Sequence, residues 1–216
     1  MAGVVSTPAI AAQSVCEQAG VEAERAFNLP AGLLLAIGRV ESGRWDPVLG
    51  RTVPWPWSVN LAGNGQHLPT KADAVSAVRQ ALAAGVRSID TGCFQINLQH
   101  HPTAFADPEQ AFDPTANARY AARFLNELRE KFGNWEIAVQ HYHSANPERG
   151  IPYGRMVIAR WTGSPPPPAA GPAVPVVANG MRIWTPSPLG TAPALISIES
   201  KPTTPVKLPR VTVLAR

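Results

Sequence analysis

The chain has only two cysteines, and no stretch of about 18 or more consecutive apolar residues occurs in it. The missing apolar stretch excludes a membrane-spanning helix. Cys16 and Cys93 are far apart in the sequence and lack the CxxC and Cys/His spacings typical of zinc sites. We therefore expect no metal ion and no cofactor. Two alternatives remain for the cysteines, a single disulfide or two buried thiols.

An excess of positive charge is also missing from most of the chain. Residues 1–163 contain 14 Lys and Arg residues and 14 Asp and Glu residues, whereas residues 164–216 contain five and one. The net charge of +4 and the pI of about 9.4 therefore come from the last quarter alone. Because the first three quarters carry no basic stripe, we do not expect nucleic acid as a partner.

The first residues, MAGVVSTPAIAAQS, lack the basic start of a secretory signal peptide but share its small and apolar end. We interpret residues 1–13 as the remnant of a signal that starts upstream, or as a disordered N-terminus. The first alternative makes the protein an exported one. Export to an oxidising compartment would in turn favour the disulfide.

Apolar residues recur at helical spacing through most of residues 14–163, which predicts one mainly helical domain there. Capping residues support several of the helices: Pro30 opens the second, Thr70 caps the third and Asn134 caps the last. The segment WSVNL-AGNG-QHL predicts a short β-hairpin with its turn at the glycines. We expect helices at residues 14–27, 30–42, 71–84, 115–132 and 134–145.

Residues 164–216 contain 12 of the 23 prolines and no periodic apolar face. This composition predicts a Pro-rich, disordered tail. The motifs MRIW and ALISI could pair as strands, although short adhesive segments in a flexible arm are the favoured interpretation. A partner-binding arm, a spacer and a regulatory segment all remain open as the role of the tail.

Glu41 is the first candidate catalytic residue, because it ends the apolar helical segment AIGRV. A carboxyl group serves as a general acid near neutral pH only when its pKa is raised, and apolar surroundings raise it. Ser42 and Gly43 follow and could break the helix beside a cleft. The alternative is a solvated glutamate at a helix end, which this segment alone does not exclude.

Three separated segments carry a more specific pattern: ESGR from Glu41, GCFQIN from Gly92 and AVQHYHSA from Ala138. In this order they resemble the Glu-Ser, Gly-Leu-Met-Gln and Ala-Tyr-Asn signatures of the soluble lytic transglycosylase (SLT) domain. The segment DPTANARYAARFLNELREKFGNW resembles the helix that precedes the third signature in that family. The resemblance covers about residues 15–160.

The resemblance implies a lysozyme-like fold, mainly α with the β-hairpin as a small insertion, and cleavage of peptidoglycan. Glu41 would protonate the glycosidic oxygen between N-acetylmuramic acid and N-acetylglucosamine, and then act as base on the muramyl 6-hydroxyl. That hydroxyl attacks the anomeric carbon and leaves a 1,6-anhydro end. Two alternatives stay open: a muramidase that uses water, and a glycan-binding or scaffold protein with little activity.

The same resemblance implies Ser42, Gln95, Tyr142 and His143 as substrate-binding residues. Gln95 should line the cleft, and Tyr142 should place its hydroxyl close to Glu41; for both, the alternative is a buried polar residue that binds backbone groups. Ser42 either orients Glu41 or only ends its helix. His143 replaces the usual Asn of the third signature and can still donate and accept a hydrogen bond.

A retaining hydrolase needs a second carboxylate unless the substrate supplies a nucleophile. Asp46 and Asp90 are the nearby candidates. We expect both to be structural, Asp46 through an Asp-Pro turn and Asp90 by securing the backbone before Gly92. Trp55 and Trp57 either stack on sugar rings or plug the core.

Cys93 and Phe94 replace the usual Leu-Met of the second signature. A cysteine here and another near the first helix resemble transglycosylases dedicated to flagellar or secretion-system assembly. This resemblance implies a periplasmic enzyme whose partners are peptidoglycan and, through the C-terminal tail, flagellar rod or secretion-system proteins. If the first helix crosses nearby, Cys16 comes within reach of Cys93, and we predict a bond between them.

Overall fold

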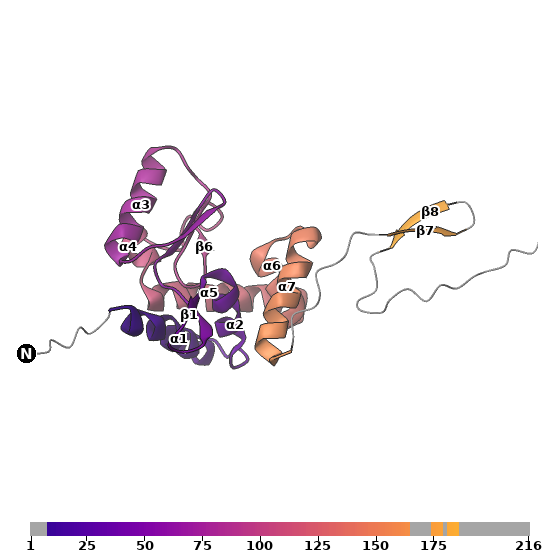
Figure 1. Cartoon of the computed structure of the whole chain (residues 1–216), viewed down its shortest axis with the longest axis horizontal. Helices are drawn as coiled ribbons and strands as arrows, with labels where there is room; N and C mark the ends of the chain where they lie inside the picture. Colours follow the sequence, from indigo (N-terminus) through magenta and orange to yellow (C-terminus); the bar gives the residue numbers. More distant parts are fainter. Residues whose placement is uncertain (1–7, 165–173, 179–180, 186–216) are drawn as a thin grey trace, which may run out of the picture. The chain divides into compact units, whose positions relative to one another are not determined.

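The computed structural model describes residues 8–164, 174–178 and 181–185 (Figure 1). The chain divides into two units, Met1–Pro167 and Pro168–Arg216, and each is described by itself. The helices of the first unit are α1 (Pro8–Ala26), α2 (Leu33–Glu41), α3 (Lys71–Ala83), α4 (Pro108–Ala111), α5 (Pro114–Phe132), α6 (Trp135–His143) and α7 (Pro147–Thr162). Its strands are β1 (Gly43–Asp46), β2 (Arg51–Pro54), β3 (Ser58–Leu61), β4 (Asn64–His67), β5 (Ile89–Thr91) and β6 (Ile96–Asn97).

The mainly helical fold with a small antiparallel sheet is the one predicted from the sequence. Two boundaries differ. Helix α1 begins at Pro8, whereas the predicted helix began at residue 14. Helix α2 begins at Leu33, because Gly32 before it adopts a left-handed φ of 82° that interrupts the turn after Pro30.

Helix α7 was not predicted, and it completes the helical part of the domain. It packs against α2 and α6, while α5 packs against α1 and α6 (Figure 1). Trp161 near its end donates a hydrogen bond from Nε1 to the carbonyl of Ala31 (2.9 Å). This bond ties the end of α7 to the start of α2.

Four of these strands form a sheet in the order β4-β3-β5-β6, with all neighbours antiparallel. The predicted hairpin is confirmed as β3–β4, in which Leu61 pairs with Asn64. Ala62 and Gly63 between them both have positive φ, 51° and 96°. Positive φ at both central residues is typical of the two-residue turns that match strand twist.

A second hairpin, β1–β2, was not predicted and begins two residues after Glu41. Its turn is closed by Asp46, whose Oδ1 accepts the backbone N–H groups of Val48 (2.7 Å) and Leu49 (3.0 Å). A Cβ at Gly43 would lie 2.1 Å from the carbonyl oxygen of Arg39. Only glycine therefore lets the chain turn so closely from α2 into β1.

The domain has two groups of buried apolar side chains, one among α1, α2, α5, α6 and α7 and one between the sheet and α3. Trp55 is 2% exposed and donates a hydrogen bond from its indole to the carbonyl of Leu68 (2.8 Å). It meets Trp57 edge to face, with ring centroids 5.4 Å apart. Trp55 is thus a plug of the core, the second of its two sequence-based alternatives.

Cys16 of α1 and Cys93 form a disulfide, with Cα atoms 5.8 Å apart. Both cysteines are fully buried. The bond closes a loop across 77 positions and joins the first helix to the segment between β5 and β6. Such a bond stabilises the fold mainly by restricting the unfolded chain.

The second unit contains an antiparallel hairpin of β7 (Val174–Ala178) and β8 (Met181–Thr185) within the predicted tail. The motif MRIW therefore does form a strand, but its partner is Val174–Ala178. ALISI and the rest of the predicted disordered tail lie outside the described residues. Within the part of the chain that the structure describes, no helix has both the length and the apolar character needed to cross a membrane.

Candidate active site

Glu41 is the last residue of α2. Leu33, Leu34 and Ile37 on this helix have no exposed surface. The helix therefore runs through the core and brings one carboxyl group from apolar surroundings to the edge of a cleft.

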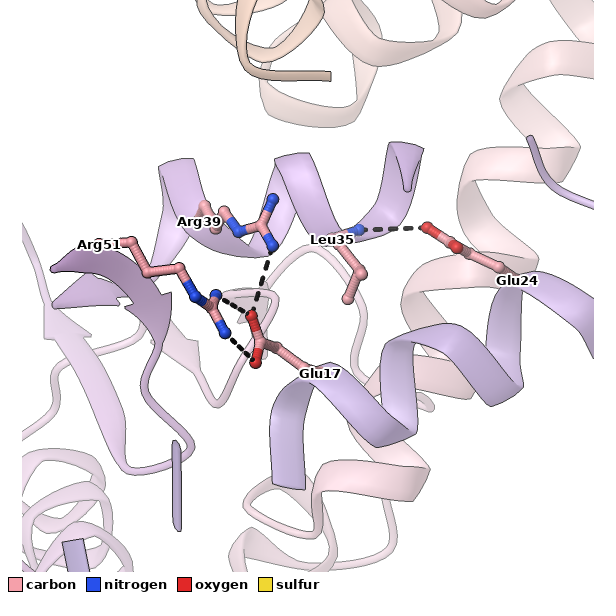
Figure 2. Close-up of polar contacts among 5 residues, drawn as sticks. All are labelled: Glu17, Glu24, Leu35, Arg39 and Arg51. Atoms are coloured by element: carbon pink, nitrogen blue, oxygen red, sulfur yellow. Dashed lines mark hydrogen bonds and ion pairs between the residues drawn. The ribbon is translucent and has the colours of Figure 1, made fainter. Parts of the chain in front are cut away.

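The start of α2 is held by a carboxylate from another helix. Gly32 precedes α2 and offers no side chain to cap it. Glu24 of α1, which is 4% exposed, accepts hydrogen bonds from three backbone N–H groups instead. The donors are Gly32 (2.8 Å), Leu34 (2.8 Å) and Leu35 (3.2 Å), of which Figure 2 draws the last. Because the first N–H groups of a helix have no partners within it, this carboxylate satisfies them and complements the helix dipole.

A second carboxylate of α1, Glu17, joins three elements nearer the surface (Figure 2). It pairs with both terminal nitrogens of Arg51 in β2 and with Arg39 of α2 at 3.3 Å. The hydrogen bond from Arg51 is the main reason that the pKa of Glu17 is lowered. Since these side chains are partly exposed, each pair contributes only about 0–1 kcal/mol.

Ser42 is 1% exposed and does not line the cleft. Its hydroxyl lies 2.6 Å from the carbonyl oxygen of Cys93 and accepts the backbone N–H of Trp55 at 3.2 Å. These contacts occupy the hydroxyl within the protein. They join the end of α2 to the segment that carries Gln95. The assignment of Ser42 to substrate binding stays a prediction.

That segment is shaped by Gly92 and Asn117. Gly92 has a φ of 80°, and a Cβ there would lie 2.6 Å from the amide nitrogen of Asn117. The fully buried Asn117 donates to the carbonyls of Thr91 (2.9 Å) and Ala111 (3.1 Å) and accepts from the N–H of Phe94 (2.9 Å). A single side chain of α5 thus holds both sides of the turn.

Gln95 lies in the cleft with a left-handed φ of 47°, which is uncommon for a residue other than glycine. Its amide nitrogen donates to the carbonyls of Ser58 (3.1 Å) and Gly92 (3.0 Å). Two carbonyls require the NH₂ end of the amide, so the orientation of the side chain is defined. The amide oxygen accepts no hydrogen bond from the described residues.

The three signature segments meet in a cleft of about 670 Å³. Its lining includes four of the residues assigned from the sequence: Glu41, Gln95, Tyr142 and His143. A second cavity of about 420 Å³ lies toward α7 and shares Glu41, His143 and Arg149 with the first. Glu41 therefore stands where the two cavities meet.

Burial raises the pKa of Glu41 to about 7. Tyr153 acts against this rise through its hydroxyl, while the negative charge of Asp90 adds to it. Around pH 7, roughly half of such carboxyl groups carry a proton, which is the condition a general acid and base needs.

Two tyrosines flank Glu41. The Tyr142 hydroxyl donates to the carbonyl of Phe94 at 2.8 Å. Burial raises the pKa of this phenol, and the nearby charge of Glu41 adds to the rise. Tyr153, which is 4% exposed, makes no hydrogen bond of standard geometry, but its hydroxyl lies close enough to lower the pKa of Glu41.

Asp90 also lines the cleft. Its Oδ1 accepts a hydrogen bond from Asn97 (2.7 Å). Burial raises the pKa of Asp90, and the hydrogen bond from Asn97 and the charge of His143 oppose the rise. The carboxylate of Asp46, by contrast, accepts backbone N–H groups of its own turn, as expected.

His143 stacks on Tyr153, with ring centroids 4.4 Å apart and an interplanar angle of 10°. Burial and the positive charge of Arg149 lower its pKa, so its ring is mostly neutral near pH 7. His141 instead stacks on Phe132 at 3.9 Å. In the described ranges, no group of three or more His, Cys, Asp or Glu side chains is arranged to hold a metal ion.

Sequence reasoning missed the roles of Glu24, Asn117 and Tyr153. A glutamate near the C-terminal end of a helix is unfavourable for the dipole, and this could have pointed to a partner for Glu24. Asn117 belongs to the DPTAN segment that resembles the family, but no role was predicted for it. Tyr153 was missed because α7 itself was not predicted.

A protein-family model described as the transglycosylase SLT domain matches residues 19–148, which is more than half of the chain. The match includes the three segments that meet at the cleft and ends at the second residue of α7. No curated protein and no solved structure matches the chain significantly.

Proposed function

The chain belongs to the transglycosylase SLT domain family, and on this basis we propose that it cleaves the β-1,4 bond between N-acetylmuramic acid and N-acetylglucosamine with Glu41 as acid and base. The domain is that of lytic transglycosylases, which are lyases acting on peptidoglycan. The observation that carries the proposal is the pKa of Glu41, raised to about 7 at the junction of two cavities.

In the first step, protonated Glu41 gives its proton to the glycosidic oxygen, and the bond from that oxygen to the anomeric carbon breaks. In the second step, ionised Glu41 takes the proton of the muramyl 6-hydroxyl as its oxygen bonds to the anomeric carbon. The products are a free N-acetylglucosamine hydroxyl and a 1,6-anhydromuramyl end. No water is consumed, and Glu41 returns to its protonated state.

We assign the glycan contacts to three residues of the cleft. The amide oxygen of Gln95 is available to accept a hydrogen bond from a sugar hydroxyl or N–H group. His143, mostly neutral near pH 7, offers a donor and an acceptor in the same cavity. Tyr142 contributes its ring face, since its hydroxyl is bound to Phe94.

The test is mass analysis of the soluble products that the wild type and Glu41→Gln release from purified peptidoglycan. We expect anhydromuropeptides from the wild type and a rate at least about 10³ lower from the variant, which keeps the shape of the side chain but has no acid. If the wild type binds peptidoglycan and releases no product, the protein is a glycan-binding or scaffold protein instead.

Asp90 favours one alternative function, a hydrolytic muramidase. A second carboxyl group in the cleft of Glu41 could stabilise positive charge at the anomeric carbon or form a covalent intermediate that water then opens. Hydrolysis leaves a reducing end, which is heavier than the anhydro end by one water. The same mass analysis therefore separates the two functions, and Asp90→Asn should abolish only the hydrolytic one.

We further propose that the protein is exported to the periplasm and opens the wall locally during flagellar or secretion-system assembly. Its substrate lies outside the cytoplasm, and a buried disulfide is typical of proteins from oxidising compartments. Residues 164–216 would recruit it to the assembling machine. A truncation after Thr162 should keep its cooperative thermal transition and its activity but fail to localise.

A further inference from the structure

The lining of the two cavities at Glu41 contains one Lys or Arg side chain, that of Arg149. Arg149 lies in the first turn of α7, four residues before Tyr153, so the two side chains project from the same face of the helix. Because Tyr153 acts on Glu41 and stacks on His143, this face is the one that borders the cleft.

The guanidinium of Arg149 makes no ion pair with an acidic side chain among the described residues. The positive charge of Arg149 nevertheless acts on the cleft, because it contributes to the lowered pKa of His143. Its backbone N–H is bound to the carbonyl of Asn146 (3.1 Å) and takes no part. A guanidinium group is always positively charged and can donate two parallel hydrogen bonds. Where it has no ion-pair partner at a binding site, it is suited to bind a carboxylate.

We propose that Arg149 is a specificity-determining residue that binds a carboxylate of the substrate's stem peptide. This inference rests on the proposed function. The N-acetylated sugars of an intact strand are uncharged, and the stem peptide on the muramyl lactyl group carries the carboxylates. The position of Arg149 at the junction of both cavities therefore selects muramyl residues that carry an anionic peptide.

The test compares native peptidoglycan with peptidoglycan whose carboxylates have been converted to neutral amides. For the wild type, amidation should lower kcat/KM about fivefold, the effect expected of an exposed ion pair. Arg149→Gln should cleave native material at about the rate at which the wild type cleaves amidated material. Arg149→Lys, which keeps the charge but not the fork, should retain part of the preference.

Arg155→Gln is the matched control, because Arg155 is an exposed arginine of the same helix that lines neither cavity. It should keep the preference of the wild type. Each protein is judged by its own ratio of rates on the two substrates, so that a partly unfolded variant does not imitate the effect.

If the wild type cleaves native and amidated peptidoglycan at the same rate, this result by itself overturns the inference. That result, with anhydromuropeptides still released, removes the role of Arg149 and leaves the proposed function standing. An equal preference in Arg149→Gln and the wild type would overturn it as well. If no protein of the set releases a product or sediments with peptidoglycan, the proposed function fails and this inference fails with it.

Discussion

A glutamate carboxyl group lies at each end of helix α2, one from α1 and one from α2 itself. The surroundings of the two groups are opposite. At the N-terminus, Glu24 of α1 accepts three backbone N–H groups and is 4% exposed. At the C-terminus, Glu41 accepts no hydrogen bond of standard geometry from the described residues, and burial raises its pKa to about 7. The helix dipole favours a negative charge at the first position and disfavours it at the second.

The comparison separates a carboxylate that stabilises the fold from one that is available for chemistry. Donors that fully satisfy Glu24 make it a structural cap. Glu41 lacks such donors, so the proton is held near neutral pH and can be given to a substrate. The hydrogen-bond donors around each carboxyl group, together with burial and the end of the helix that it faces, thus divide the two roles.

The largest effect on stability is expected from Glu24→Ala. The change leaves the N–H groups at the start of α2 without their buried partner, at a cost of about 3–5 kcal/mol in the free energy of unfolding. The melting temperature should fall by roughly 10 °C. Glu22→Ala, at an exposed position of the same helix, is the control and should change it little. A similar small change for both variants would show that Glu24 is no cap.

Glu41→Gln should have the opposite effect on stability at high pH. The pKa of Glu41 is about 7 in the folded protein, whereas the ordinary value for a solvated glutamate is 4.5. The contribution of protonated Glu41 to the free energy of unfolding is therefore fully present below pH 4.5. It is lost as pH rises through 7, by up to about 3 kcal/mol. The variant lacks this loss, so it should be more stable than the wild type at pH 8 and about equal to it at pH 4.

Urea unfolding of both proteins at the two pH values measures this effect. Glu22→Gln serves as the control for removing a surface carboxylate. A wild type that is as stable at pH 8 as the Gln variant would contradict the raised pKa.

Tyr153→Phe should change the pH dependence of catalysis. The wild type should lose activity above about pH 7, because Glu41 loses the proton that it must donate. The hydroxyl of Tyr153 lowers the pKa of Glu41, so its removal should shift this decline to higher pH, by about one unit or less. Tyr120→Phe removes a hydroxyl that is bound to His101 (2.9 Å) and should leave the profile in place. A shift to lower pH in Tyr153→Phe would reverse the role given to this residue.

The smallest effect is expected from Glu17→Gln, the third carboxylate along the α1–α2 contact. Its pairs with Arg39 and Arg51 are partly exposed, so the loss should be below about 1 kcal/mol and should shrink in high salt. Thermal unfolding at two salt concentrations measures it. A loss as large as that of Glu24→Ala would mean that the surface pairs, and not the buried cap, hold α2.

Local patterns predicted the elements whose signals lie within a few residues. The β3–β4 hairpin was found from its Ala-Gly turn, and α3 and α6 from Thr70 and Asn134, whose side chains do cap them. Helix α7 was missed because Pro152 lies within it and Gly150 and Gly154 weaken its helical propensity. The glycines are needed for packing, since a Cβ at Gly154 would lie 2.5 Å from the side chain of Gln140.

The sequence by itself determined the helical domain, the β3–β4 hairpin and the identity of Glu41 as the acid to examine, because periodicity, caps and motif order are properties of neighbouring residues. The tertiary structure decided the burial of Ser42, the hydroxyl partner of Tyr142, and the placement of Asp90 and Arg149 beside Glu41. These depend on residues far apart in the chain, such as Ser42 and Cys93, which packing alone brings together. The raised pKa of Glu41 has the same origin, since burial is a property of the assembled core.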